Sequence, residues 1–236
     1  MRIPFTIAAL IASFVAVQLS LVLFPDYERA LLFHFALFPA RVLGDAPLAG
    51  QSLLGVLNLL SYGWLHGGWG HCAINSLWLL AFGTPLARRM GALRFLIFYC
   101  ACVVLAGLGQ VLVSSDAMQV VPIIGASGGV AACMGGALRF AFIYRGADND
   151  GNTPLLPLRD IPRTRPVLMF ILIWVIFNVV FGLTAPLLGQ GEVGSIAWQA
   201  HLVGFFAGLC LLRWFDAPPR SPSGGPGQVP YGQWRQ

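Results

Sequence analysis

The stretch VPIIGASGGVAACMGG, residues 121–136, decides the fold. It is apolar enough for a membrane helix, yet glycine and alanine occupy half of its positions, and a single serine, Ser127, lies among the glycines. Small residues on a helix allow two backbones to approach closely. The stretch therefore predicts either a packing face that happens to contain Ser127 or a serine held as a nucleophile where water is scarce.

The composition of the chain places this stretch in a membrane. Apolar residues make up 57% of the 236 residues and charged residues only 10%, against about 25% in soluble globular proteins. Charge-free runs of the length of a membrane span, roughly 20 residues, recur along the chain. We expect an all-α membrane protein, a bundle of six transmembrane helices, at about residues 4–24, 67–87, 95–114, 121–143, 167–187 and 195–213.

The first of these runs could also be a signal peptide, because it follows a single basic residue, Arg2. Its apolar stretch extends to Phe24, longer than the roughly 7–15 residues of a typical signal-peptide core. A retained first helix is the interpretation that we adopt.

The distribution of arginine predicts the orientation. All 14 basic residues are arginine, and they cluster in the predicted 2–3 and 4–5 connections and after the last helix. The 3–4 and 5–6 connections contain only Asp116 and Glu192 as charged residues. By the positive-inside rule both termini are cytoplasmic. The pI near 9.3 then reflects topology, and we expect no nucleic-acid partner.

Two segments fall outside the predicted spans. Residues 25–66 combine apolar clusters with prolines and predict a first loop lying in the membrane interface. The sequence thus divides into a membrane domain, residues 1–215, and a tail, residues 216–236, whose Pro, Gly and Ser content predicts a disordered cytoplasmic extension. All five cysteines lie in predicted spans, where buried thiols act as small apolar groups.

Polar residues of three predicted helices converge at one depth. Ser127 lies six residues into a helix starting at 121, about 9 Å below the outer boundary at 1.5 Å per residue. His201 lies six residues into a helix starting at 195. His71 and Asn75 lie four and eight residues into a helix starting at 67, on one helix face. Ionisable residues in spans are costly and usually face a functional cavity, so this layer predicts a site.

The residue types predict serine chemistry at that site. A serine needs an adjacent base, and imidazole is the usual one; no Asp or Glu lies within the spans, so we expect a Ser127–His201 dyad. His71, Asn75 and the backbone N–H of Ser127 are candidate donors to an oxyanion. Each residue also has a structural interpretation: the serine could bond its own backbone, and His71 and Asn75 could bond each other.

Two other motif interpretations fit less well. GASGG satisfies the GxSxG pattern of α/β-hydrolases, but that motif needs a preceding strand and a soluble sheet. A zinc site from His66, His71 and His201 would leave Ser127 unexplained, so we expect no metal and no cofactor.

The glycines provide the close approach that a dyad needs. Gly204 and Gly208 form a GxxxG pattern on the helix of His201, and Gly125 and Gly128 flank Ser127. We expect these four glycines to bring the serine and histidine helices together.

With these residues assembled, the chain resembles the rhomboid intramembrane serine proteases. The resemblance rests on LHGGWGHCAIN (65–75), GASGG (125–129) and AHLVGFFAG (200–208), and covers about residues 5–213. It implies that Ser127 is the nucleophile and His201 the base, with His71 and Asn75 in the oxyanion hole. It also implies cleavage of transmembrane segments of other membrane proteins, a membrane-embedded first loop, and a gate for substrate at the fifth helix or the cap that follows it.

The chain departs from the family pattern at two positions. A glutamate that many members have near the end of the second helix is absent, with Ala87 and Arg88 in its place. Ala131 occupies the position, four after the nucleophile, where an aromatic ring often stacks on the catalytic imidazole.

Three functions remain to be weighed. The first is an intramembrane serine endopeptidase of the inner membrane, with the site near the periplasmic face, in a bacterium with a GC-rich genome. The alternative is a catalytically inactive rhomboid-like protein that binds membrane clients. A channel would need polar residues through the whole bilayer, whereas the inner halves of these helices are apolar. The oligomeric state is not predicted.

Overall fold

The computed structural model describes residues 2–44, 48, 50–114, 120–141, 154–184 and 197–216. Across these ranges the chain is helical, apart from one isolated β-bridge between Leu37 and Ile123. The all-helical prediction is therefore confirmed for the described residues.

Within the described ranges, three helices are long and apolar enough to cross a membrane: α1 (Phe5–Leu23), α7 (Ala92–Val113) and α9 (Arg165–Thr184). They correspond to the predicted spans at 4–24, 95–114 and 167–187, although residues 185–187 lie outside the described residues. Apolar side chains follow one another along these helices without a polar face, which is typical of helices surrounded by lipid and protein rather than water.

The span predicted at 67–87 is interrupted. It consists of α5 (Trp69–Trp78), the π-helical turn η3 (Leu79–Gly83) and α6 (Thr84–Met90). Pro85 has no N–H to continue the α-helical ladder, so the hydrogen-bond pattern changes in the turn before it. The continuous α-helix that we expected there is therefore wrong in its interior, but the chain still follows one path.

The helix predicted at 121–143 begins six residues later than expected. α8 spans Ser127–Ala141, whereas Leu37 and Ile123 exchange backbone hydrogen bonds of 3.0 and 2.9 Å, which hold the preceding segment extended. Gly125, with a φ of 128°, cannot be part of a right-handed helix. Ser127 is thus the first residue of a helix, and the depth estimate that assumed a helix from 121 rested on the wrong element.

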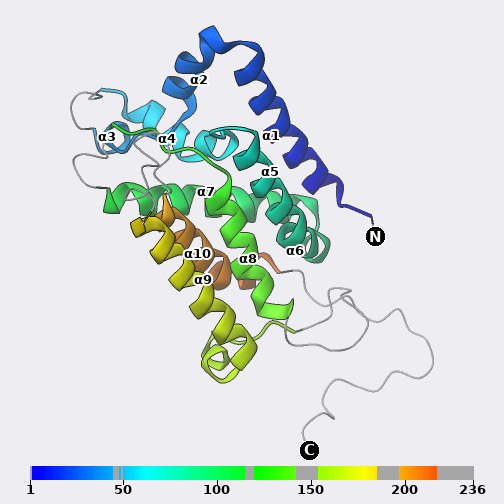
Figure 1. Cartoon of the computed structure of the whole chain (residues 1–236). Coiled ribbons are helices and arrows are strands. Elements are labelled where there is room, and N and C mark those ends of the chain that lie inside the picture. Colours follow the sequence, from blue (N-terminus) through cyan, green and yellow to red (C-terminus); the bar gives the residue numbers. More distant parts are fainter. Residues whose placement is uncertain are drawn as a thin grey trace, which may run out of the picture.

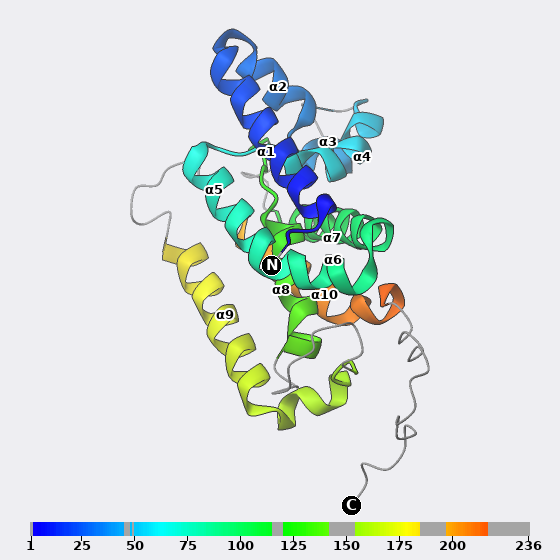
Figure 2. The same ribbon diagram turned by 90° about the vertical axis from the view of Figure 1, so that its right-hand side faces the viewer.

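Helix α8 passes through the middle of the bundle, as Figures 1 and 2 show. Every residue from Gly128 to Phe140 is buried, although α8 contains many glycines and alanines. It contacts α10 (Trp198–Phe215) more than any other element, and it also contacts α7. Neighbouring helices therefore pack closely against the backbone of α8, and this close packing buries its small residues.

Glycines make the contact between α8 and α10 possible. A Cβ atom on Gly204 would overlap the carbonyl oxygen of Gly128, and one on Gly208 would overlap that of Ala132. A Cβ atom on Gly128 would lie 2.5 Å from the Cβ atom of Ala106 on α7. Backbone packs on backbone at this interface, which is the geometry that small residues permit between membrane helices.

Helix α9 lies at the outside of the bundle (Figure 2). It packs against α10 and the 3-10 segment η5 (Leu158–Arg163), and only Val167, Ile171 and Asn178 of its twenty residues are buried. Its exposed face is apolar, with Ile173, Ile176 and Phe177 each more than half exposed. Such a face suits a helix in contact with lipid.

The predicted first loop is itself helical. It contains η1 (Pro25–Tyr27), α2 (Glu28–Phe35), α3 (Pro39–Leu43), α4 (Ser52–Ser61) and η2 (Tyr62–Trp64). Its centre is Arg41, which is fully buried and donates to the Phe33 carbonyl (2.9 Å), Asn58 Oδ1 (2.7 Å) and Gln51 Oε1 (3.1 Å). That this segment lies within the membrane stays a prediction.

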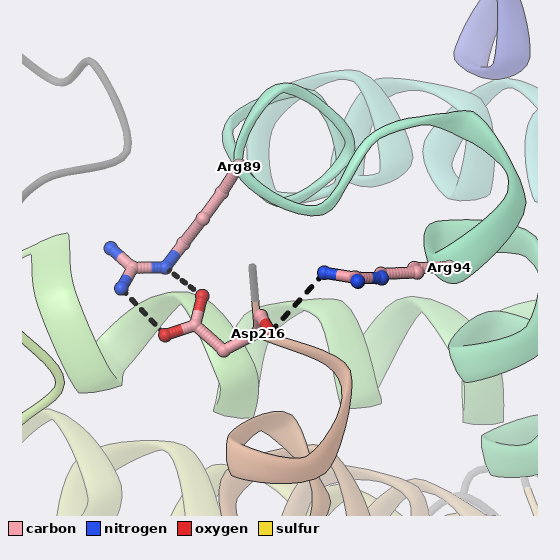
Figure 3. A network of polar contacts seen from close by, with 3 residues as sticks. All are labelled: Arg89, Arg94 and Asp216. Carbon is pink, nitrogen blue, oxygen red and sulfur yellow. Dashed lines mark hydrogen bonds and ion pairs between the residues drawn. The ribbon is translucent and has the colours of Figure 1, made fainter. Parts of the chain in front are cut away.

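An ion-pair network joins three elements at the end of the bundle away from Ser127 (Figure 3). Arg89 of α6 donates from Nε and Nη2 to the two carboxylate oxygens of Asp216, at 2.5 and 2.8 Å. Arg94 of α7 donates to the backbone carbonyl of Asp216 at 3.5 Å. Asp216, which we had assigned to the tail, thus fastens the end of α10 to α6 and α7, and residues 217–236 lie outside the described residues.

Candidate active site

Ser127 and His201 meet where α8 and α10 begin. Ser127 is the first residue of α8, and His201 lies in the first turn of α10. The Oγ atom of Ser127 is 2.7 Å from Nε2 of His201, a hydrogen-bond distance. This separation is possible because Gly128, next to Ser127, and Gly204, one turn after His201, leave no side chain between the helices.

The start of α10 is held in place by α7. Gln110 of α7 is fully buried, and its Oε1 atom accepts a 3.1 Å hydrogen bond from the N–H of Ala200. The first N–H groups of a helix have no partner within the helix, so this side chain supplies one. The turn that contains His201 is therefore tied to a neighbouring helix as well as to α8.

A residue that the sequence analysis did not identify contacts the other side of the imidazole. Oδ1 of Asn178, on α9, lies 3.0 Å from Nδ1 of His201. Asn178 is only 8% exposed, although it sits in an otherwise apolar stretch of α9. That isolated amide in an apolar span was the signal that could have identified it, because buried polar groups in membrane helices need partners.

His71 and Ser127 both lie close to Gly125. The N–H of Gly67 donates to Nδ1 of His71 at 3.3 Å, so in the neutral ring the proton is on Nε2. A Cβ atom added at Gly125 would lie 3.1 Å from His71 Nε2 and 3.5 Å from Ser127 Oγ. The N–H donor of His71 therefore borders the same small space as the serine oxygen.

Asn75 completes the group of predicted site residues. It is buried one helical turn after His71 in α5, and its Nδ2 atom donates to the His71 carbonyl at 3.1 Å. The amide has a second N–H that this bond does not use. The structure thus brings Ser127, His201, His71 and Asn75 to one cavity, although the helix of Ser127 does not begin where the depth estimate assumed; the role of each remains a prediction.

These four side chains and Asn178 line a cavity of about 770 Å³ between α5 and α9. The polar groups occupy one end. Apolar side chains form the other walls, among them Trp78 and Phe82 on one side and Trp174 and Phe177 on the other. A cavity of this size accommodates several residues of a peptide, and its walls suit an apolar segment.

At Ala131 the cavity wall has no aromatic ring to stack on His201. Ala131 is buried and lines the cavity. The nearby ring contact is between α9 and α10: Trp174 stacks on Phe205 with centroids 4.3 Å apart and planes 17° apart. Near Ala131, which replaces the aromatic residue of many family members, α9 therefore packs directly against the helix that carries His201.

Among the described residues, no three His, Cys, Asp or Glu side chains are arranged to hold a metal ion. The ring of His66 instead packs against Phe14 and edge-on against His71, with centroids 5.3 and 5.2 Å apart.

Comparison of the sequence with known proteins shows the family of this chain. Residues 54–216 match the rhomboid domain family, so the chain belongs to the rhomboid family and is a multi-span helical membrane protein. It is 36% identical over 85 residues to RHOMBOID-like protein 4 of Arabidopsis thaliana, covering 36% of this chain and 21% of that protein. It is 29% identical over 180 residues to uncharacterized proteins of Mycobacterium tuberculosis and Mycobacterium bovis, covering 75% of this chain and 65% of each.

Proposed function

We propose that this protein is an intramembrane serine endopeptidase that cleaves transmembrane segments of other membrane proteins. The observation that carries the proposal is the 2.7 Å contact of Ser127 Oγ with His201 Nε2 at the polar end of an otherwise apolar cavity. Rhomboids are a family of intramembrane serine proteases, and the chain belongs to that family over residues 54–216.

The positions of the side chains support the following reaction. Ser127 Oγ–H donates to Nε2 of His201, which removes the proton as Oγ attacks the carbonyl carbon of the scissile peptide bond. The bond to the leaving nitrogen breaks as His201 returns the proton to it, leaving an acyl ester on Ser127. A water molecule then attacks the ester with His201 again as base, and release of the carboxylate regenerates Ser127.

Three donors border the position where the oxyanion forms. They are the Nε2–H of His71, the side-chain amide of Asn75 and the backbone N–H of Ser127. The last also lies at the N-terminus of α8, where the helix dipole favours negative charge. His71 and Asn75 are each held by a hydrogen bond within this region, from the Gly67 N–H and to the His71 carbonyl, which favours donors that are positioned before charge develops.

The membrane topology that we propose has six spans. Three spans are the long apolar helices α1, α7 and α9. The other three are the path of α5, η3 and α6, then α8, and then α10. The arginines at the end of the bundle opposite Ser127 support a cytoplasmic position for that end, by the positive-inside rule. The catalytic residues then open toward the outer, periplasmic face of a bacterial inner membrane, and substrate enters from the bilayer between α5 and α9.

The experiment that tests this function uses the full chain in liposomes with a model transmembrane substrate. Ser127→Ala and His201→Ala should each lower cleavage by more than about 1,000-fold, since the nucleophile and its base act as a unit. Ser20→Ala and His34→Ala are matched controls, because Ser20 bonds only its own helix and His34 lies on α2, outside the cavity.

Covalent labelling by a fluorophosphonate probe provides a second measurement. Wild-type protein should be labelled at Ser127, and His201→Ala should remove the labelling in protein that remains folded. Cleavage by the Ser127→Ala protein at the wild-type rate would refute the proposal. A wild-type protein that binds the substrate but neither cleaves it nor reacts with the probe would be the inactive rhomboid-like alternative.

A further inference from the structure

We infer that Asn178 is a positioning residue for His201, which makes the proposed catalytic unit a chain of three side chains: Ser127, His201 and Asn178. The inference rests on the proposed protease function. It assigns a role to α9, a helix on which neither the sequence motifs nor the family match singles out a site residue.

The hydrogen bonds of Asn178 fix which way its amide points. Nδ2 donates to the carbonyl oxygen of Trp174, one turn earlier in α9, at 2.9 Å. A carbonyl oxygen accepts and cannot donate, so the amide nitrogen must be the atom on that side. Oδ1 is then the atom that faces His201, 3.0 Å from Nδ1.

The orientation of the amide in turn fixes the tautomer of His201. An amide oxygen only accepts, so Nδ1 of His201 must carry the proton that it donates to Asn178. In the neutral ring Nε2 then has a free lone pair, and it points at Ser127 Oγ, 2.7 Å away. This is the tautomer that a general base for Ser127 requires.

The surroundings of the ring offer few other means of orientation. Position 131, where a ring would stack on the imidazole, is alanine, and the described residues that line the cavity include no carboxylate. Without Asn178 the imidazole could exchange between tautomers and rotate toward the cavity. An apolar residue at 178 would also leave Nδ1–H without an acceptor in a place with little water.

The contact between α9 and α10 is reinforced one turn away. Trp174 lies four residues before Asn178, and Phe205 lies four residues after His201. Their stacked rings therefore form a second connection parallel to the hydrogen bond. Together the two contacts hold the otherwise loosely packed α9 in register with the histidine helix.

Substitutions of Asn178 separate a positioning role from a structural one. Asn178→Leu keeps the side-chain size but removes the acceptor, and we expect kcat to fall about 10- to 100-fold with KM changed less than about threefold, as for loss of a partner that orients a catalytic imidazole. Asn178→Asp keeps an oxygen acceptor and should restore kcat to within about fivefold of wild type. Thr184→Val is the matched control, since Thr184 is on the same helix and bonds only the carbonyl of Val180.

Wild-type and Ser127→Ala proteins assayed in parallel separate a failure of the protease function from a failure of the role given to Asn178. If wild type cleaves and Ser127→Ala does not, but Asn178→Leu cleaves within threefold of wild type, the role of Asn178 is refuted and the protease function stands. Equal losses in Asn178→Leu and Asn178→Asp would also refute it, because they would indicate a packing requirement instead of an acceptor.

A measurement without turnover tests the same inference independently. Nitrogen-15 NMR of histidine-labelled protein, with His201→Ala to assign the signal, should show His201 protonated at Nδ1 in wild type and a mixture of tautomers in Asn178→Leu. The same tautomer in both proteins would overturn the inference, whether or not the protein cleaves the substrate.

Discussion

Gly125 sets the geometry of the site at the scale of a single residue. Its φ of 128° turns the extended segment into the first turn of α8, and its missing side chain leaves room for the ring of His71. Gly125→Ala would combine a backbone conformation that costs about 1–3 kcal/mol for other residues with a Cβ atom 3.0 Å from His71 Cε1. We expect fluorophosphonate labelling of Ser127 to slow at least about tenfold, because small displacements of reacting groups are costly.

Gly70→Ala is the control for this prediction. Gly70 is also next to His71, but a Cβ atom there meets nothing within 4 Å. Since alanine is favoured over glycine in helices by about 0.5–1 kcal/mol, Gly70→Ala should label at the wild-type rate with equal or greater stability. Similar slowing in both variants would contradict the role given to Gly125.

Side-chain chemistry was predictable from the sequence where a polar residue stood out against an apolar background. Ser127, His201, His71 and Asn75 were identified in this way, and they do lie together. Asn178 was not predicted, although it is also a polar residue in an apolar span, because only Asp and Glu were considered as partners of His201. An amide oxygen accepts a hydrogen bond as well, and which polar residue faces which helix depends on packing that the sequence does not display.

At the scale of elements, the contact between α8 and α10 controls the distance from Ser127 to His201. Gly204→Ala would place a methyl group against the backbone of Gly128, one residue after the serine. Overpacking of this kind costs about 1–3 kcal/mol, and relief requires α10 to move away from α8. We expect a loss of unfolding free energy of that size and a fall in cleavage of about 100-fold.

Cys210→Ala is the matched control, a small change at an exposed position of the same helix. It should leave both quantities unchanged. Wild-type cleavage by Gly204→Ala would show that the interface accommodates a methyl group and that its glycines are not needed to bring the two residues together.

The boundaries of elements were less predictable than their existence. Residues 121–126 are apolar, and an apolar run of this kind fits an extended segment as well as a helix. The pairing of Ile123 with Leu37, far away in the sequence, decides between them. Similarly, the π turn in the second predicted span lies just before Pro85, where a Cβ atom on Gly83 would lie 2.8 Å from Leu79 and 3.0 Å from Ile7.

At the scale of the whole molecule, Asp216 joins the last helix to the rest of the bundle (Figure 3). Only 6% of the Arg89 side chain and 17% of the Asp216 side chain are exposed, so solvent screens the pair little. Asp216→Asn should lower the free energy of unfolding in detergent by about 1–3 kcal/mol, because it weakens a paired charge that is largely buried. Labelling of Ser127 in the folded protein should change less than about threefold, since the pair lies at the far end.

Asp160→Asn provides the comparison. Its partners Arg159 and Arg163 are 85% and 82% exposed, at 4.0 and 3.6 Å, and exposed pairs contribute about 0–1 kcal/mol. Equal destabilisation by the two substitutions would contradict the importance given to burial of the Arg89–Asp216 pair.

The position of α9 has a consequence for when the protein can act. This helix is one wall of the cavity and, by our inference, also carries the amide that aims His201. A movement of α9 large enough to admit a client helix would separate Asn178 from His201 and leave the imidazole without its orienting partner. In any one position, α9 would then either admit a substrate or support hydrolysis. Ser127 would become reactive only after α9 has closed behind the substrate.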